Sequence, residues 1–269
     1  MTSLAGFLVL LAWFAADPAF HWAGGAPRDA SCPVQDSAFV RGPGDRCFGE
    51  AGPNYAFAFA YPAQAARIPA LDALLRGRKA LAARELPSLA GLARERPGWR
   101  FHDEAIYRVD ADVPPLLALS FETSNYYGGA HGDYGGGTLI WHKAANRPIA
   151  FGALFRDRTS AFAEVARLFC PTFNRERRAN FERGGGRVVD RCPEAPYHPG
   201  LVAGTGGRIG SLRLVFIQHD GYAGGSYRVD IPVTARLIAL LKPRFPAAFS
   251  VSDAAPRSCN PNVRGGSCR

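Results

Sequence analysis

Six cysteines constrain the fold of this chain more than any other feature of its sequence. They form no Cys-x-x-Cys pair, and they fall into three couples that are close in the sequence. In an exported chain an even number of cysteines indicates disulfides, and the closely spaced ligand pairs of a zinc site are missing. Many connectivities are possible, and the simplest pairs Cys32 with Cys47, Cys170 with Cys192, and Cys259 with Cys268.

An apolar run near the N-terminus indicates export. Residues 4–16 carry no charge, and the run ends at Asp17 and Pro18. It is shorter than the roughly 20 apolar residues of a membrane span and is typical of a secretory signal. We therefore expect residues 1–26 to be a signal peptide, and the remaining chain to be periplasmic or secreted with no membrane span. No Lys or Arg precedes the run, so an uncleaved N-terminal anchor stays open as an alternative.

The charge of the chain excludes several classes of function. The formal net charge is +9, but nearly all of it comes from scattered arginines, with lysines only at 79, 143 and 242. Without a clustered basic patch or a recognised motif, nucleic acid is not an expected partner. The phosphate loop, the dinucleotide fingerprint and the His-Glu-x-x-His zinc helix are all missing from the sequence. We therefore expect no cofactor and no metal.

The periodicity of apolar residues predicts strands and helices in alternation. Residues 55–61 alternate aromatic residues with alanines, as in a strand with one aromatic face, and leucines between 68 and 96 recur at helical spacing. Residues 27–54 are rich in Gly, Pro and Asp, so we expect an irregular, stapled segment there. The remaining expected elements are strands at 99–110, 116–126 and 138–143, helices at 159–169 and 171–181, a hairpin of 212–216 with 227–231, and a last helix at 233–241.

These elements predict an α+β fold: a mostly antiparallel sheet with helices packed on one face, in a single compact, disulfide-stapled unit. The expected organisation is a signal peptide at 1–26, an N-terminal segment of a strand plus helices at 27–98, an α/β domain at 99–249, and a stapled tail at 250–269. The sequence does not indicate an oligomeric state.

A glycine-dense loop at residues 126–137 is the strongest candidate for a ligand-binding site. Its glycines permit close approach of the backbone, its tyrosines offer flat contact surfaces, and loops of this kind often carry function on a rigid scaffold. A purely structural turn is the alternative. A second polar turn, near residue 220, is the other candidate contact surface. The candidate ligand-binding residues are Tyr126, Tyr127, Gly129, His131, Asp133, Tyr134, His219 and Tyr222.

Catalytic readings of the same loop are alternatives with weaker sequence support. His131 with Asp133 or Glu122 could act as acid and base in a hydrolase, and Glu122 with Asp133 could form a carboxylate pair for sugar chemistry. A metal held by His131, Asp133 and His142 matches no standard ligand spacing. A Ser124 and His131 triad lacks the Gly-x-Ser-x-Gly elbow of such nucleophiles. We therefore expect no catalytic residues.

The loop and the hairpin together resemble a known family. Ser-Phe-Glu at 120–122, Tyr-Gly-Gly-Ala-His-Gly at 127–132, and Leu-Val-Phe-Ile-Gln-His-Asp-Gly-Tyr-Ala-Gly-Gly at 214–225 with Val-Asp-Ile-Pro at 229–232 are similar to the signature of domain-of-unknown-function family 3298. The resemblance covers about residues 99–245. The strand at 55–61 and the leucine-rich helices after it are similar to the companion 4163 family that usually precedes it.

The resemblance implies an extracytoplasmic module with an α/β fold that binds at the cell wall. Such modules occur in the lysozyme-sensing part of an anti-sigma factor and beside the catalytic domain of a peptidoglycan deacetylase. The expected partners are therefore a cell-wall glycan or a lysozyme-like protein, bound without catalysis. The alternative is a hydrolase acting on peptidoglycan or another glycan. This chain departs from both relatives, because its apolar run begins at Leu4 and it has no Thr-Phe-Asp-Asp stretch.

Overall fold

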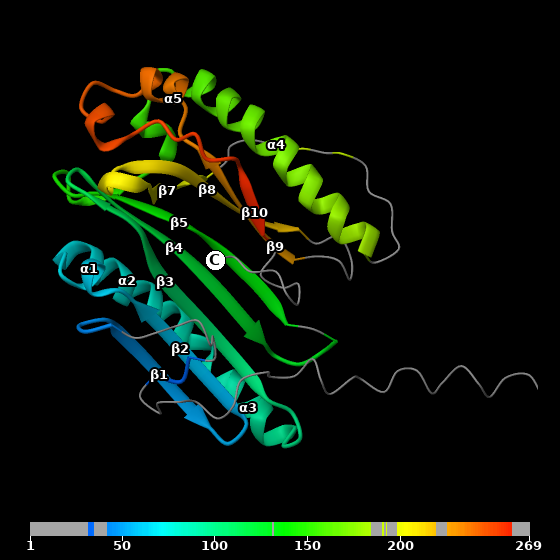
Figure 1. Ribbon diagram of the computed structural model, residues 1–269. Coiled ribbons are helices and arrows are strands. Elements are labelled where there is room, and N and C mark those ends of the chain that lie inside the picture. The colour runs from blue at the N-terminus through cyan, green and yellow to red at the C-terminus, as the bar shows by residue number, and fades with distance from the viewer. Residues whose placement is uncertain are drawn as a thin grey trace, which may run out of the picture.

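Two sheets, one of six strands and one of four, organise the part of the chain that the structure describes (Figure 1). The computed structural model describes residues 32–34, 42–130, 132–183, 190, 192, 198–218 and 225–259. The six-stranded sheet follows chain order: β1 (Arg46–Gly52), β2 (Tyr55–Tyr61), β3 (Phe101–Val113), β4 (Leu116–Tyr126), β5 (Asp133–His142) and β6 (Arg147–Ile149). The four-stranded sheet has the order β10 (Arg257–Cys259), β9 (Gly225–Pro232), β8 (Ile209–Gln218) and β7 (Gly200–Ala203).

Within the described residues, five α-helices accompany the sheets. Three of them connect β2 to β3, one long helix follows β6, and a short helix follows β9. The connection after β2 has to be a crossover, because β2 and β3 are the one parallel pair among the paired strands that the structure describes. The helices are α1 (Ala63–Ala66), α2 (Pro69–Ala82), α3 (Leu86–Glu95), α4 (Arg158–Arg183) and α5 (Ala235–Leu240).

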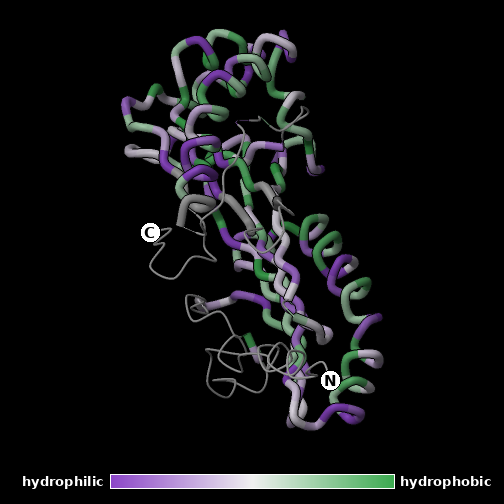
Figure 2. Tube along the Cα trace, turned by 90° about the vertical axis from the view of Figure 1, so that its right-hand side faces the viewer, coloured by the Kyte–Doolittle hydropathy of each residue, from purple (hydrophilic) through white to green (hydrophobic). Residues whose placement is uncertain are grey.

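Helices α1 to α3 cover one face of the six-stranded sheet. The helices behind the sheet in Figure 1 lie along its right-hand side in Figure 2. The aromatic face of β2, with Phe57, Phe59 and Tyr61, packs against Leu71 and Leu75 of α2. The predicted strand at 55–61 and the leucine-rich helices are therefore confirmed, and Pro87 lies in the first turn of α3 as expected.

The four-stranded sheet lies against the opposite face of the six-stranded sheet and is itself covered by α4 (Figure 1). Leu212 and Leu214 on β8 and Val229 on β9 point toward Phe169 and neighbouring residues of α4 in one core cluster. The intervening residues of both strands face the six-stranded sheet, since side chains alternate along a strand. The mixed fold class, mainly antiparallel, is confirmed, with two stacked sheets where the sequence suggested one.

Two of the three predicted disulfides are present, Cys32–Cys47 and Cys170–Cys192. The first joins residue 32 to β1, and the second joins α4 to residue 192. Cys268, the expected partner of Cys259, lies outside the described residues. Disulfides of this kind are typical of proteins that work in an oxidising compartment outside the cytoplasm.

Several element boundaries differ from the prediction. The segment at 27–54 contains the strand β1, and the tail contains β10. The glycine-rich stretch at 133–137 belongs to β5 and not to the loop. Helix α4 continues through Pro171 where we expected two helices, because Phe169 and Phe173 on either side of the proline are both buried in the same core.

Among the described residues, no helix is long and apolar enough to cross a membrane. Residues 4–16, the expected signal segment, lie outside the described residues.

The packing of α2 predicts a position-dependent cost for shortening its leucines. Leu75 is 0% exposed and Leu81 is 58% exposed in the same helix. We expect Leu75→Ala to lower the free energy of unfolding by about 2–5 kcal/mol, because it leaves a cavity in the core. Leu81→Ala is the matched control and should change it by no more than about 0.5 kcal/mol. Urea denaturation of both variants measures the difference, and equal costs would contradict the packing of α2 on the sheet.

Candidate functional site

The loop between β4 and β5 forms the free end of a long hairpin. Asn125 pairs with Asp133, so the chain turns back between these two residues. Gly128 and Gly129 have φ values of 99° and 110°, a region that residues with a Cβ rarely adopt. The glycines are therefore required by the turn itself. We call residues 126–134 the hairpin tip.

Tyr126 anchors the hairpin tip from inside. Its side chain is 5% exposed, and its ring stacks on Trp99 with the centroids 6.1 Å apart and an interplanar angle of 4°. The Tyr126 hydroxyl donates to the carbonyl oxygen of Gly129 at 2.9 Å. A buried aromatic ring with a satisfied hydroxyl holds the turn in one conformation.

Tyr127 makes a second anchor for the hairpin tip. Its hydroxyl donates to Oδ2 of Asp103 on β3 at 2.6 Å. Burial, followed by this hydrogen bond, raises the pKa of Tyr127 above its ordinary value. Burial also raises the pKa of Asp103, and the hydrogen bond from Tyr127 opposes that rise. The two tyrosines thus position the loop, and their rings are largely occupied inside the protein.

Tyr134 is the tyrosine of the hairpin tip that reaches solvent, with 45% of its surface exposed. It lies opposite Ser124 in the β4–β5 register, and therefore on the same face of the sheet. Partial burial and then the charge of the nearby Glu104 carboxylate raise the pKa of Tyr134. Asp133, the first residue of β5, is exposed as well.

His102 lies on the same face as Ser124, at a distance of 2.8 Å between Nε2 and the serine Oγ. Burial lowers the pKa of His102 to about 4. The imidazole is therefore neutral at pH 7. It is also a much weaker base than an effective general base at that pH. The pair resembles two members of a catalytic triad in composition but not in basicity.

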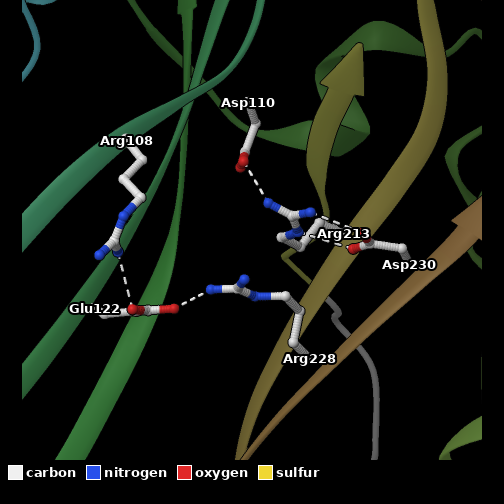
Figure 3. A network of polar contacts seen from close by, with 6 residues as sticks. All are labelled: Arg108, Asp110, Glu122, Arg213, Arg228 and Asp230. Atoms are coloured by element: carbon white, nitrogen blue, oxygen red, sulfur yellow. Dashed lines mark hydrogen bonds and ion pairs between the residues drawn. The ribbon is translucent and has the colours of Figure 1, made fainter. Parts of the chain in front are cut away.

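Farther along this face, charged side chains join the two sheets (Figure 3). Glu122 on β4 accepts from Arg108 on β3 at 2.9 Å, and its other oxygen accepts from Arg228 on β9. Both oxygens of this carboxylate are thus engaged, one by each sheet. Glu122 is held as part of the scaffold.

Arg213 on β8 makes the second link between the sheets (Figure 3). Its guanidinium donates to both oxygens of Asp230 at 2.8 and 2.7 Å, and also to Asp110 on β3. Asp110 is the unpaired residue of a β-bulge between Val109 and Ala111. A bulge re-aims the side chain of its extra residue, here toward the second sheet. Burial raises the pKa of Asp110, and the charge of Arg213 opposes that rise.

The structure separates several residues that catalysis would need together. Glu122 pairs with Gly136, whereas Asp133 pairs with Asn125, so the two carboxylates lie on opposite faces of the sheet. His142 is nine residues beyond Asp133 on β5, about 30 Å away at strand spacing. Its Nδ1 accepts from the backbone of Ala145 at 2.9 Å. The Glu122 and Asp133 pair is thus excluded, and so is a metal site joining Asp133 to His142.

The remaining predicted site residues cannot be placed. His131, His219 and Tyr222 lie outside the described residues, so their contribution to ligand binding stays a prediction. Within the described part of the chain, no group of three or more His, Cys, Asp or Glu side chains could hold a metal ion.

Sequence reasoning missed the ionic contact between the sheets. Arg213 stands between Leu212 and Leu214, and Asp230 stands opposite it in the hairpin that was predicted correctly. That cross-strand pair of opposite charge was a usable signal. The partners on β3 and β4 were not predictable, because nothing in the local pattern indicates which sheet faces which.

Several solved structures are similar to this chain, including two DUF3298 family proteins. No family model matches the chain, and no curated protein matches it. A DUF3298 family protein from Pseudomonas aeruginosa PAO1 is 17% identical with a TM-score of 0.46, over 77% of this chain and 97% of that one. A DUF3298 family member from Bacteroides fragilis is 15% identical with a TM-score of 0.44, over 72% of this chain and 87% of that one. Both belong to the family whose signature the loop and hairpin resemble.

The ion pairs between the sheets predict a strong effect of removing Arg213. The variant Arg213→Met leaves Asp110 and Asp230 without their cation, and Asp110 is 6% exposed in its side chain. We expect a loss of about 3–5 kcal/mol in the free energy of unfolding. Adding Asp110→Asn and Asp230→Asn should recover part of it. Arg76→Met is the control, because Arg76 is 60% exposed in its pair with Asp72 and should cost no more than about 1 kcal/mol.

The low pKa of His102 predicts a specific pH dependence of stability. The folded pKa of about 4 lies below the ordinary value of 6.5, so unfolding takes up a proton between these two pH values. Stability should therefore fall as the pH drops from about 6.5 to 4, by up to about 3 kcal/mol from this group. Urea denaturation of the wild type and of His102→Gln at several pH values isolates the contribution of His102 to the pH dependence of stability. Parallel pH profiles of the two proteins would show that His102 is not buried as described.

Proposed function

We propose that this chain is a non-catalytic binding module of the periplasm or the cell exterior, which binds a cell-wall glycan or a lysozyme-like protein through the hairpin tip. One observation carries the proposal. Tyr126 and Tyr127 hold the tip from inside, while Tyr134 and Asp133 remain exposed at its rim. A rigid aromatic contact loses little conformational entropy on binding, and so suits recognition of a preformed surface.

The disulfides and the N-terminal sequence support a location outside the cytoplasm. Cys32–Cys47 and Cys170–Cys192 support a compartment outside the cytoplasm, and the apolar run at residues 4–16 supports export. We infer that the mature protein acts in the periplasm or after secretion. An uncleaved anchor would hold it at the membrane.

The chemistry around the tip favours binding over catalysis. Glu122 has both oxygens engaged by arginines, and it lies on the opposite face from Asp133. His102, the imidazole beside Ser124, is only weakly basic. An acid and base on opposite faces of a sheet cannot act on the same bond.

We retain the division into an N-terminal segment at 27–98, a 3298-like domain at 99–249 and a tail at 250–269 as a proposal about ancestry. The six-stranded sheet contains β1 and β2 from the first segment and β3 to β6 from the second. The two segments therefore share one sheet.

A pull-down against insoluble peptidoglycan and against immobilised lysozyme tests the proposal. We expect Tyr134→Ser and His131→Ala to weaken retention of the oxidised chain about tenfold, the effect of losing one aromatic contact of roughly 1.4 kcal/mol. Leu81→Ser is the matched control, because Leu81 is an exposed apolar residue on α2 and should retain the wild-type affinity.

Mass analysis of the soluble fraction separates binding from turnover. Release of new glycan fragments would identify a hydrolase and overturn the non-catalytic proposal. Retention that is equal in the wild type and in both tip variants would place the contact surface elsewhere.

A further inference from the structure

We propose that the chain has a second ligand site, a pocket that takes a small carboxylate, at the end of the six-stranded sheet far from the hairpin tip. The pocket has a volume of about 270 Å³. Leu117 lies in its wall, nine residues before Tyr126 on β4 and so about 30 Å from the tip. The inference does not rest on the proposed function. The lining residues are Gln64, Arg67, Ile68, Asp112, Leu117 and Lys143.

Two parts of the fold build this pocket. Asp112 and Leu117 are cross-strand neighbours on β3 and β4, and Lys143 follows the end of β5. The other wall is the junction between α1 and α2, at Arg67 and Ile68. The Arg67 backbone donates to Ala63 at 3.0 Å, which fixes the point from which its side chain projects.

The charges in the pocket are not balanced. Lys143 donates to Oδ1 of Asp112 at 2.5 Å and to the carbonyl oxygen of Val113 at 2.7 Å. Asp112 is thus neutralised by its own partner. Within the described part of the chain, the side chains of Arg67 and Gln64 have no hydrogen-bond or ion-pair partner. The site keeps one uncompensated positive charge, with an amide beside it.

These groups define the chemical class of the ligand. A free guanidinium binds a carboxylate through two parallel hydrogen bonds, and the Gln64 amide can supply a further donor. Ile68 and Leu117 offer apolar contacts for a short side chain next to the carboxylate. The α2 helix begins at Pro69 with Ile68 as its N-cap, and its N-terminal end adds a favourable field for an anion.

The same groups select against more highly charged anions. With Asp112 paired to Lys143, Arg67 leaves the pocket one net positive charge, so a second negative charge on the ligand would have no partner there. A monoanion of modest size fits both the charge and the volume. Two sources share this chemistry: the C-terminal carboxylate of a short peptide, and a free small organic acid.

NMR titration of the isotope-labelled, oxidised chain tests the site with four probes: acetyl-alanyl-alanine, its C-terminal amide, propionate and inorganic phosphate. We expect the free-carboxylate peptide or propionate to shift the backbone amides of residues 64–68, 112, 117 and 143 saturably, at millimolar concentrations or below. Tighter binding of the peptide assigns the site to a chain terminus, and equal binding assigns it to small acids. The amide probe and phosphate should bind at least tenfold more weakly.

Two variants make the result specific. Arg67→Gln should weaken carboxylate binding at least tenfold, and Arg67 is exposed, so the fold should survive. Arg84→Gln, an exposed arginine outside the pocket, should leave the binding unchanged. Tyr134→Ser should also leave this titration unchanged, which separates the pocket from the hairpin tip. The proposal is overturned by the absence of saturable shifts, by equal binding of the amide probe, by tighter binding of phosphate, or by wild-type affinity in Arg67→Gln.

Discussion

Ion pairs join the two sheets, and the arrangement of the other layers depends on this contact. Arg213 and Arg228 of the four-stranded sheet reach Asp110 and Glu122 of the six-stranded sheet. Since the charged faces of β8 and β9 point inward to this contact, their apolar faces point outward, where α4 covers them. Charges taken out of water have to be paired, so this contact tolerates few other orientations of the two sheets.

The same stacking leaves the two ends of the six-stranded sheet free for different uses. Beyond the ion pairs, β4 and β5 continue to a turn that Tyr126 and Tyr127 hold through hydrogen bonds from their hydroxyl groups. At the other end, the α1–α2 junction overhangs the start of β4 and leaves a pocket beside Arg67. A rigid scaffold with ligand-contacting groups at its ends is the usual way in which loops acquire function.

Glycine is where prediction from the sequence was least reliable. Gly136 and Gly137 suggested a loop, yet they lie in the middle of β5. A Cβ on Gly137 would lie 2.9 Å from ring atoms of Phe121, and one on Gly136 would lie 3.3 Å from Val215 of the second sheet. These glycines allow close packing on both faces of a strand. Local propensity cannot distinguish that role from the positive φ required at Gly128 and Gly129.

The sequence by itself determined the elements whose periodicity is strong: the β2 strand, the leucine-rich helices, the β8–β9 hairpin and the two local disulfides. These depend on neighbours in the chain, and short-range spacing records such neighbours. Only the tertiary structure decided that the polar face of β8 and β9 meets another sheet and not water. It also decided that Tyr126 is buried while Tyr134 is exposed, and that Arg67 and Lys143 share a pocket. Those outcomes arise from contacts between distant segments, and an alternating strand has the same pattern whether water or a charged partner covers its polar face.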